Sequence, residues 1–134
     1  MSLNFANKYE PRHCILEDRW FDATVVINCS GVLDMLTAPV LQQHIVNALT
    51  ENPTAMIIDL TDIEFLASHG MGVLIATHDL VTPSIPFSVV ADGPVTRRPR
   101  TLIDIDNLLI MHATLHAALE DSQAATATDR RLIA

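Results

Sequence analysis

Hydrophobic residues in this chain cluster in short runs that predict the strands of a sheet. Ala23–Cys29, Ala55–Leu60 and Phe87–Ala91 are nearly continuous apolar segments, as strands covered on both faces usually are. Cys14–Glu17 and Leu108–Met111 are shorter candidates of the same kind. The pattern therefore predicts a sheet of 4–5 strands.

Between these runs the apolar residues change to helical spacing. Residues 38–51 carry apolar side chains on one face, and Pro39 falls in the first turn, where its missing N–H costs no hydrogen bond. Met71–Val81 and Leu115–Glu120 are further helix candidates, and Val95–Ile103 is a weaker one. We expect about four helices.

The order of these segments predicts an α/β fold. Strands that alternate with helices are joined by right-handed crossovers, which give a mostly parallel or mixed sheet. Arg19–Asp22 is the expected turn between the first two strands, and Ser30–Gly31 is expected to end the second strand. Val32–Thr37 then leads to the first helix, with Asp34 or Thr37 as its candidate cap.

Length and composition fit one globular domain. The 134 residues are 49% hydrophobic and 18% charged, which favours a packed core over disorder. No apolar run approaches the roughly 18 residues that a membrane span needs. No signal peptide is visible either, so we expect a cytoplasmic protein without membrane insertion. Residues 1–12 are expected to be a loose lead-in and 122–134 a flexible tail.

The charge balance and the absence of enzyme motifs narrow the function classes. A net charge of -8 and 4% aromatic residues disfavour nucleic-acid binding. The chain lacks nucleotide-binding glycine loops, His112 and His116 have no third metal ligand nearby, and Ser68 lacks a nucleophile elbow. We therefore expect no catalytic residue, no metal and no cofactor. The basic cluster Arg97, Arg98 and Arg100 is either a solvated face or a docking point for an acidic partner or a phosphate.

Cys14 and Cys29 lie on the first two predicted strands. If these strands pair directly, the two thiols come close together, but a parallel crossover could place another strand between them. Two buried thiols that act as small hydrophobic side chains and a redox-active pair both remain open.

The segment Asp59–Gly72 carries the most informative pattern. A buried strand ends at Leu60, a loop is expected over Thr61–Gly70, and Ser68 stands just before a predicted helix. Loops beyond the carboxyl ends of strands are where open α/β sheets place their sites. A serine at a helix N-terminus can cap the free N–H groups, or it can carry a phosphate that the helix dipole favours.

Several blocks of the chain resemble the STAS domains of bacterial anti-sigma factor antagonists. Val25–Asp34 (VVINCSGVLD) resembles the family's apolar strand followed by G-x-L-D, and Ile57–Gly72 (IIDLTDIEFLASHGMG) resembles its signature around the phosphoacceptor serine. Leu102–Leu119 resembles the closing helix, strand and helix. The resemblance implies a single STAS domain over residues 13–121.

The resemblance also implies a mechanism. In this family the unphosphorylated antagonist binds an anti-sigma factor, a serine kinase of the histidine-kinase ATPase fold, and so frees the sigma factor. The kinase then phosphorylates the signature serine, which corresponds to Ser68, and the complex breaks; a phosphatase resets it. The partner surface would include the residues Asp34, Thr61, Asp62, Ala67, Ser68, His69 and Met71. Met71 would be an exposed apolar contact, unless it points into the core.

Two positions depart from the signature. Ala67 replaces the family's aspartate before the acceptor, and His69 replaces the serine or threonine after it. These changes favour an alternative use of the same fold, as a non-phosphorylated accessory subunit, for example of a lipid-transport ATPase, or as a sensory scaffold. An enzyme with Ser68 as nucleophile is a third possibility.

Overall fold

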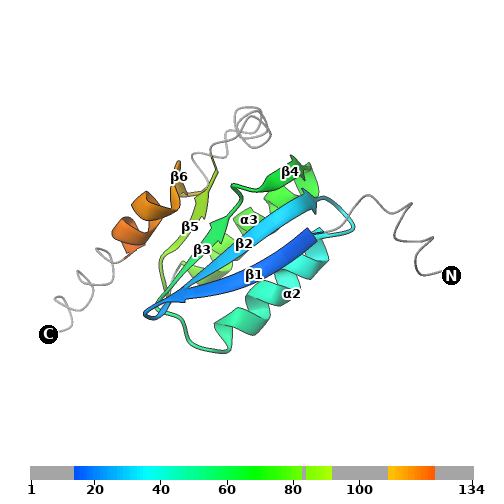
Figure 1. Cartoon of the computed structure of the whole chain (residues 1–134). Helices are drawn as coiled ribbons and strands as arrows, with labels where there is room; N and C mark the ends of the chain where they lie inside the picture. Colours follow the sequence, from blue (N-terminus) through cyan, green and yellow to red (C-terminus); the bar gives the residue numbers. More distant parts are fainter. Residues whose placement is uncertain (1–13, 83, 92–108, 123–134) are drawn as a thin grey trace, which may run out of the picture.

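Two strands precede each of the helices α2 and α3 in the computed structural model, which describes residues 14–82, 84–91 and 109–122 (Figure 1). The predicted helix at Val95–Ile103, the arginine cluster at 97–100, the lead-in and nearly all of the tail lie outside the described residues. A last helix covers residues 115–122. The other elements are β1 (Cys14–Phe21), β2 (Thr24–Leu33), α2 (Ala38–Leu49), β3 (Ala55–Asp59), β4 (Ile63–Leu66), α3 (Ser68–Val81), β5 (Phe87–Val90) and β6 (Met111–His112).

The sheet is mixed, as the sequence predicts. Its strands lie in the order β1-β2-β3-β5-β6, and β4 pairs with the far end of β2. β1 runs antiparallel to β2, and the other described pairs are parallel. Because side chains alternate along a strand, the sheet has two apolar faces. Val25 and Ile27 belong to the core that includes α2 and α3, whereas Val26 and Ile57 pack with Ala118 of the last helix.

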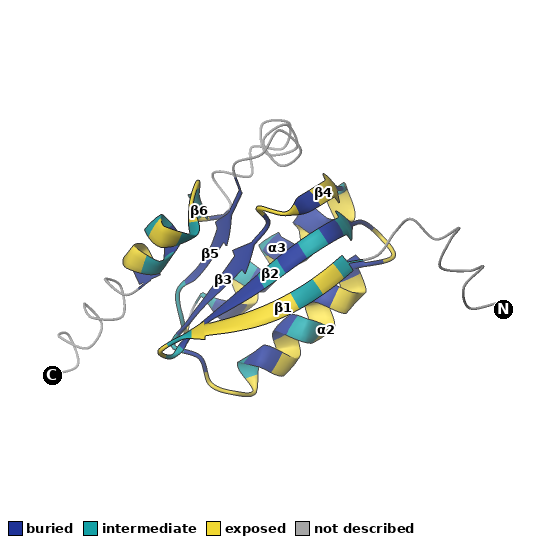
Figure 2. Cartoon of the chain, viewed as in Figure 1, coloured by how far each residue is buried: buried dark blue, intermediate teal, exposed yellow. Residues whose placement is uncertain are grey.

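Burial falls from the centre of the sheet toward one edge. Every residue of β3 and of β5 is buried, which explains why these strands are nearly continuous apolar runs (Figure 2). β1 pairs with β2 alone, and most of its side chains are exposed. Among the described residues, no helix is both long and apolar enough to cross a membrane.

The prediction of a turn at Arg19–Asp22 is wrong. β1 continues through Phe21, which pairs with Thr24, so only Asp22 and Ala23 remain for the hairpin turn. Asp22 has φ 57, a left-handed conformation that aspartate tolerates better than most residues. The absence of a glycine in this turn is the reason that the pattern does not reveal its position.

The prediction that Ser30–Gly31 ends the second strand is also wrong. β2 runs on to Leu33, and its register shifts between Gly31 and Val32, where it begins to pair with β4. Gly31 has φ 96, which glycine adopts at little cost. The expected loop at Thr61–Gly70 therefore contains a strand, so the described residues form a sheet of six strands.

Helix α3 begins three residues earlier than predicted, at Ser68. Its first turn packs closely on the end of β2: a Cβ atom added at Gly70 would lie 2.7 Å from Leu33 Cγ and 3.0 Å from the Leu33 carbonyl oxygen. Gly72, in the same helix, has no such neighbour within 4 Å. Glycine is thus required at position 70 because the helix approaches the strand so closely.

These two glycines give a matched test of this packing. Gly70→Ala is expected to lower the free energy of unfolding by about 1–3 kcal/mol, because the new methyl group displaces Leu33. Gly72→Ala is expected to leave stability unchanged or raise it by up to about 1 kcal/mol, through better helix propensity. Urea unfolding followed by circular dichroism measures both values. Equal effects of the two substitutions would contradict the close approach.

Candidate functional site

The far end of β2 brings together the segments that the sequence analysis singled out. Val32 pairs with Phe65 and Leu33 with Leu66, so β4 lies directly beside the loop that follows β2. The Ala67 N–H donates a hydrogen bond to the Leu33 carbonyl at 2.9 Å, which fixes the start of α3 at the same place. Residues far apart in sequence therefore form one surface at this corner of the domain.

The loop between β2 and α2 is held by its own side chains. The Asp34 carboxylate accepts hydrogen bonds from the N–H groups of Leu36 and Thr37, at 3.0 and 3.1 Å. The Thr37 hydroxyl accepts from the Asp34 N–H at 2.9 Å and donates to the Val32 carbonyl at 2.7 Å. Asp34 and Thr37 are both buried, and their side chains hold the backbone of the loop. The prediction that one of them caps the helix is wrong, because Thr37, the N-cap residue of α2, makes no side-chain capping hydrogen bond and the Asp34 carboxylate accepts from N–H groups that precede the helix.

This loop holds two apolar side chains in solvent. Met35 is 61% exposed and Leu36 is 57% exposed, although their backbone is fixed by Asp34 and Thr37. Phe65, on the neighbouring strand β4, is 52% exposed. A group of large exposed apolar side chains on an ordered surface is typical of a protein-binding site.

The turn between β3 and β4 is fixed in a similar way. The buried Asp59 carboxylate accepts hydrogen bonds from the N–H group of Thr61 at 2.9 Å and from its hydroxyl at 2.5 Å. Thr61 and Asp62 are exposed, and Asp62 accepts a hydrogen bond from the Asn28 amide at 3.4 Å. The two aspartates predicted for the surface thus differ: Asp62 lies on it and Asp34 supports it from inside.

Ser68 is the first residue of α3 and is exposed. The helix N-cap is Ala67, with φ -95 and ψ 169, and it has no side-chain capping hydrogen bond. The proposed role of Ser68 as the helix cap is therefore wrong, because a capping side chain belongs one residue earlier. Within the described part of the chain, the exposed Ser68 hydroxyl makes no hydrogen bond to another residue.

The other predicted residues divide between surface and core. His69 is exposed beside Ser68, and Ala67 is half-buried. Met71 is 5% exposed and packs in the main core, so the structure places it away from the surface and assigns it the core role. We call the exposed group Met35, Leu36, Phe65, Ser68 and His69 the Ser68 surface.

Sequence reasoning missed the three apolar members of this surface. The segments that hold Met35, Leu36 and Phe65 are predicted as connections, where apolar side chains have no core to enter. That conflict between a predicted loop and a large apolar residue is the signal that could have identified them.

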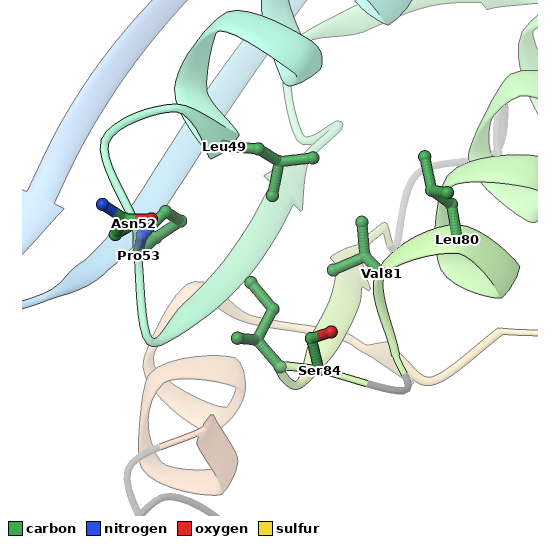
Figure 3. Close-up of a pocket in the computed structure, with 7 residues that line it drawn as sticks. Leu49, Asn52, Pro53, Leu80, Val81 and Ser84 are labelled. Atoms are coloured by element: carbon green, nitrogen blue, oxygen red, sulfur yellow. The ribbon is translucent and has the colours of Figure 1, made fainter.

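A shallow groove runs from this surface between the two helices. It is lined by Gln42 of α2 and by Ser68, His69, Gly72, Val73 and Ala76 of α3. A second pocket, of about 220 Å³, lies at the opposite ends of the same helices (Figure 3). Leu49, Pro53, Leu80, Val81 and Ile85 give it apolar walls.

No group of three metal-ligating side chains occurs among the described residues. His112 Nε2 lies 3.4 Å from Asp121 Oδ2, and His116 Nε2 lies 3.3 Å from Glu120 Oε2, so each histidine faces its own carboxylate.

Comparison with known proteins places the chain in a family. The family model described as "STAS domain" matches residues 16–118. The anti-sigma-F factor antagonist RsfB of Mycobacterium tuberculosis is 41% identical over 98 residues, which covers 73% of this chain and 80% of the relative. The crystal structure of an anti-sigma factor antagonist from Mycobacterium paratuberculosis is 37% identical, with a TM-score of 0.80 over 84% of this chain and 97% of that one.

More distant structures share the fold. The unphosphorylated anti-sigma factor antagonist SpoIIAA has 18% identity and a TM-score of 0.66, over 82% of this chain and 97% of that one. The fold, the match over most of the chain and the two mycobacterial relatives agree with the resemblance carried by the segments around Asp34 and Ser68. The chain belongs to the STAS domain family, among the anti-sigma factor antagonists.

Proposed function

We propose that this protein antagonises an anti-sigma factor by binding it through the Ser68 surface, which releases a sigma factor for transcription. The observation that carries the proposal is the position of Ser68: an exposed hydroxyl with no hydrogen bond to any residue that the structure describes, at a helix N-terminus without a side-chain cap, next to exposed apolar residues. The named antagonists among its relatives support the regulatory role over an enzymatic one. A cytoplasmic site of action follows from this role.

The apolar residues supply the attraction. Met35, Leu36 and Phe65 expose more than half of their surface, and a partner that covers them gains the hydrophobic free energy of that area. The backbone of the loop is already ordered by Asp34 and Thr37, so binding costs little conformational entropy there. Such pre-ordered apolar side chains are the usual anchors of a protein interface.

Ser68 supplies the switch. Phosphorylation adds about -1.5 to -2 charges at neutral pH, and an apolar interface cannot accommodate that charge without a large desolvation cost. In the free protein, the open N–H groups at the start of α3 favour the same phosphate. Modification therefore stabilises the free form relative to the complex.

Ala67 stands in place of the family's aspartate and removes a charge that could order the loop or contact the kinase, so this exchange favours the non-phosphorylated alternative. It also leaves no negative charge beside a phosphate on Ser68, so the modified form meets less repulsion there. SpoIIAA, a distant relative in the same fold, has been solved in both its phosphorylated and its unphosphorylated form. The kinase would be the anti-sigma factor itself, a serine kinase of the histidine-kinase ATPase fold, and ATP would bind to that partner.

The first prediction concerns Ser68. Ser68→Glu is expected to weaken binding to the anti-sigma kinase by about 100-fold, because it places a charge in the apolar contact. Ser68→Ala is expected to keep the affinity and to prevent phosphate transfer from ATP. Calorimetry with the kinase that co-purifies with the tagged chain measures the affinity, and intact mass measures the phosphate. Phosphate on another residue, or equal binding of both variants, would contradict the proposal; capture of a transporter ATPase instead would favour the accessory-subunit alternative.

The second prediction concerns the apolar anchors. Phe65→Ala is expected to weaken binding to the same kinase at least about tenfold, which is the loss typical of an interface anchor. Leu80→Ala is the matched control, since Leu80 is 69% exposed but lies near the other end of α3, beside the second pocket. Surface plasmon resonance compares the two variants after circular dichroism shows that both are folded. If Leu80→Ala weakens binding and Phe65→Ala does not, the interface lies at the second pocket and the proposal is wrong.

The third prediction separates the two acidic residues. Asp34→Ala is expected to cost about 1–2 kcal/mol of stability, because it removes the carboxylate that accepts from the buried Thr37 N–H and from the partly buried Leu36 N–H. Asp62→Ala is expected to change stability by less than about 0.5 kcal/mol, as surface substitutions usually do. Thermal unfolding measures the difference, and similar losses for both variants would refute the supporting role of Asp34.

A further inference from the structure

The structure resolves how the two cysteines are placed. β1 and β2 pair directly, with Leu16 opposite Cys29 and Cys14 opposite Gly31. Directly opposed residues of an antiparallel pair share a face, so Cys14 and Cys29 are diagonal neighbours on the same side of the sheet. Their Sγ atoms are 2.9 Å apart. The sequence left open whether another strand lies between the two thiols, and the structure shows that the two strands pair directly.

We propose that hydrogen peroxide converts Cys14 and Cys29 into a reversible disulfide that links β1 to β2. A disulfide needs sulfur atoms about 2.05 Å apart, so the two atoms have to approach by less than 1 Å. The chain contains two cysteines in all, so no other disulfide can form within it. The proposal is independent of the function assigned to Ser68.

The two thiols differ in solvent exposure and in pKa, which decides which of them reacts first with peroxide. Cys14 is half-buried on the edge strand, within reach of a small oxidant, whereas Cys29 is completely buried. A hydrogen bond from the Cys29 thiol lowers the pKa of Cys14, which favours the reactive thiolate there. The same hydrogen bond, together with burial, raises the pKa of Cys29. Cys14 is therefore the attacking sulfur and Cys29 the resolving one.

The reaction balances with peroxide as the oxidant. The Cys14 thiolate attacks one oxygen of hydrogen peroxide, the O–O bond breaks, and hydroxide leaves with a proton from solvent as water. The Cys29 sulfur then attacks the Cys14 sulfenic acid, the S–O bond breaks, and a second water leaves with the Cys29 proton. Two thiols are oxidised and one peroxide is reduced to two waters. A dithiol reductant reverses the link by exchange.

The bond would restrain the least protected strand of the sheet. β1 is an edge strand that pairs with β2 alone, and its side chains are mostly exposed. Cys29 lies two residues before Gly31, where β2 begins to pair with β4. The link would anchor the start of β1 to a buried and well-paired part of β2, so its amide hydrogens are expected to exchange more slowly in the oxidised form.

The experiment uses the full chain, reduced and then treated with a stoichiometric amount of hydrogen peroxide. The expected product is a monomer that has lost about 2 Da and takes up no alkylating reagent after denaturation, as a disulfide requires. Peptide mapping without reductant should show the Cys14 and Cys29 peptides joined, and dithiothreitol should restore both thiols. The melting temperature of the oxidised form should be several degrees higher.

Two controls test whether disulfide formation depends on the folded structure. The same peroxide treatment in urea is expected to form the link at least about tenfold more slowly, because unfolding removes the proximity of the thiols. Cys14→Ser should lose no mass and should keep a buried Cys29 that resists alkylation in the folded protein. Three outcomes would overturn the proposal: over-oxidation of Cys14 without a link, disulfide-joined dimers as the main product, or equal rates in folded and unfolded chains.

Discussion

The close approach of α3 to the end of β2 is the constraint on which the rest of this structure depends. Gly70 lies against Leu33 with no space for a side chain, and the Ala67 N–H is bonded to the Leu33 carbonyl. This contact sets where α3 begins and hence where Ser68 points. It also requires β2 to extend past Gly31 and to exchange neighbours there, which the positive φ of that glycine permits.

At the same corner, the residues that stabilise the turns are different from the residues that are exposed on the surface. Asp34, Thr37 and Asp59 are buried, and their side chains hold backbone groups of two turns. The exposed residues between them, such as Leu36 and Asp62, contribute little to the core. The surface thus consists of exposed side chains on a backbone that buried side chains fix from beneath.

Much of this fold is legible from the sequence, for identifiable physical reasons. The central strands are buried on both faces, so the continuous apolar runs at Ala55–Leu60 and Phe87–Ala91 predict them directly. Helix α2 is predicted from the regular spacing of its apolar residues. β4 was missed because its four residues are too few for a periodic signal. The position of the hairpin turn at Asp22 is not predicted, because the turn contains no glycine and the edge strand β1 carries exposed polar side chains such as Arg19 just before it. Ser68 can be identified from the sequence motif around it. Phe65 and Met35 come to lie on the same surface only because β2 pairs with β4, which the sequence does not predict.

Gly72 has a consequence for how relatives of this chain could diverge. It lies in the groove beside Ser68, and a side chain there would meet open space rather than the core. Substitutions at this position can reshape the groove without loss of folding free energy, unlike substitutions at Gly70 two residues away. Position 72 is therefore a place where relatives of this chain can differ in the shape of the groove, and so in which ligand surface fits it, while they keep the same scaffold.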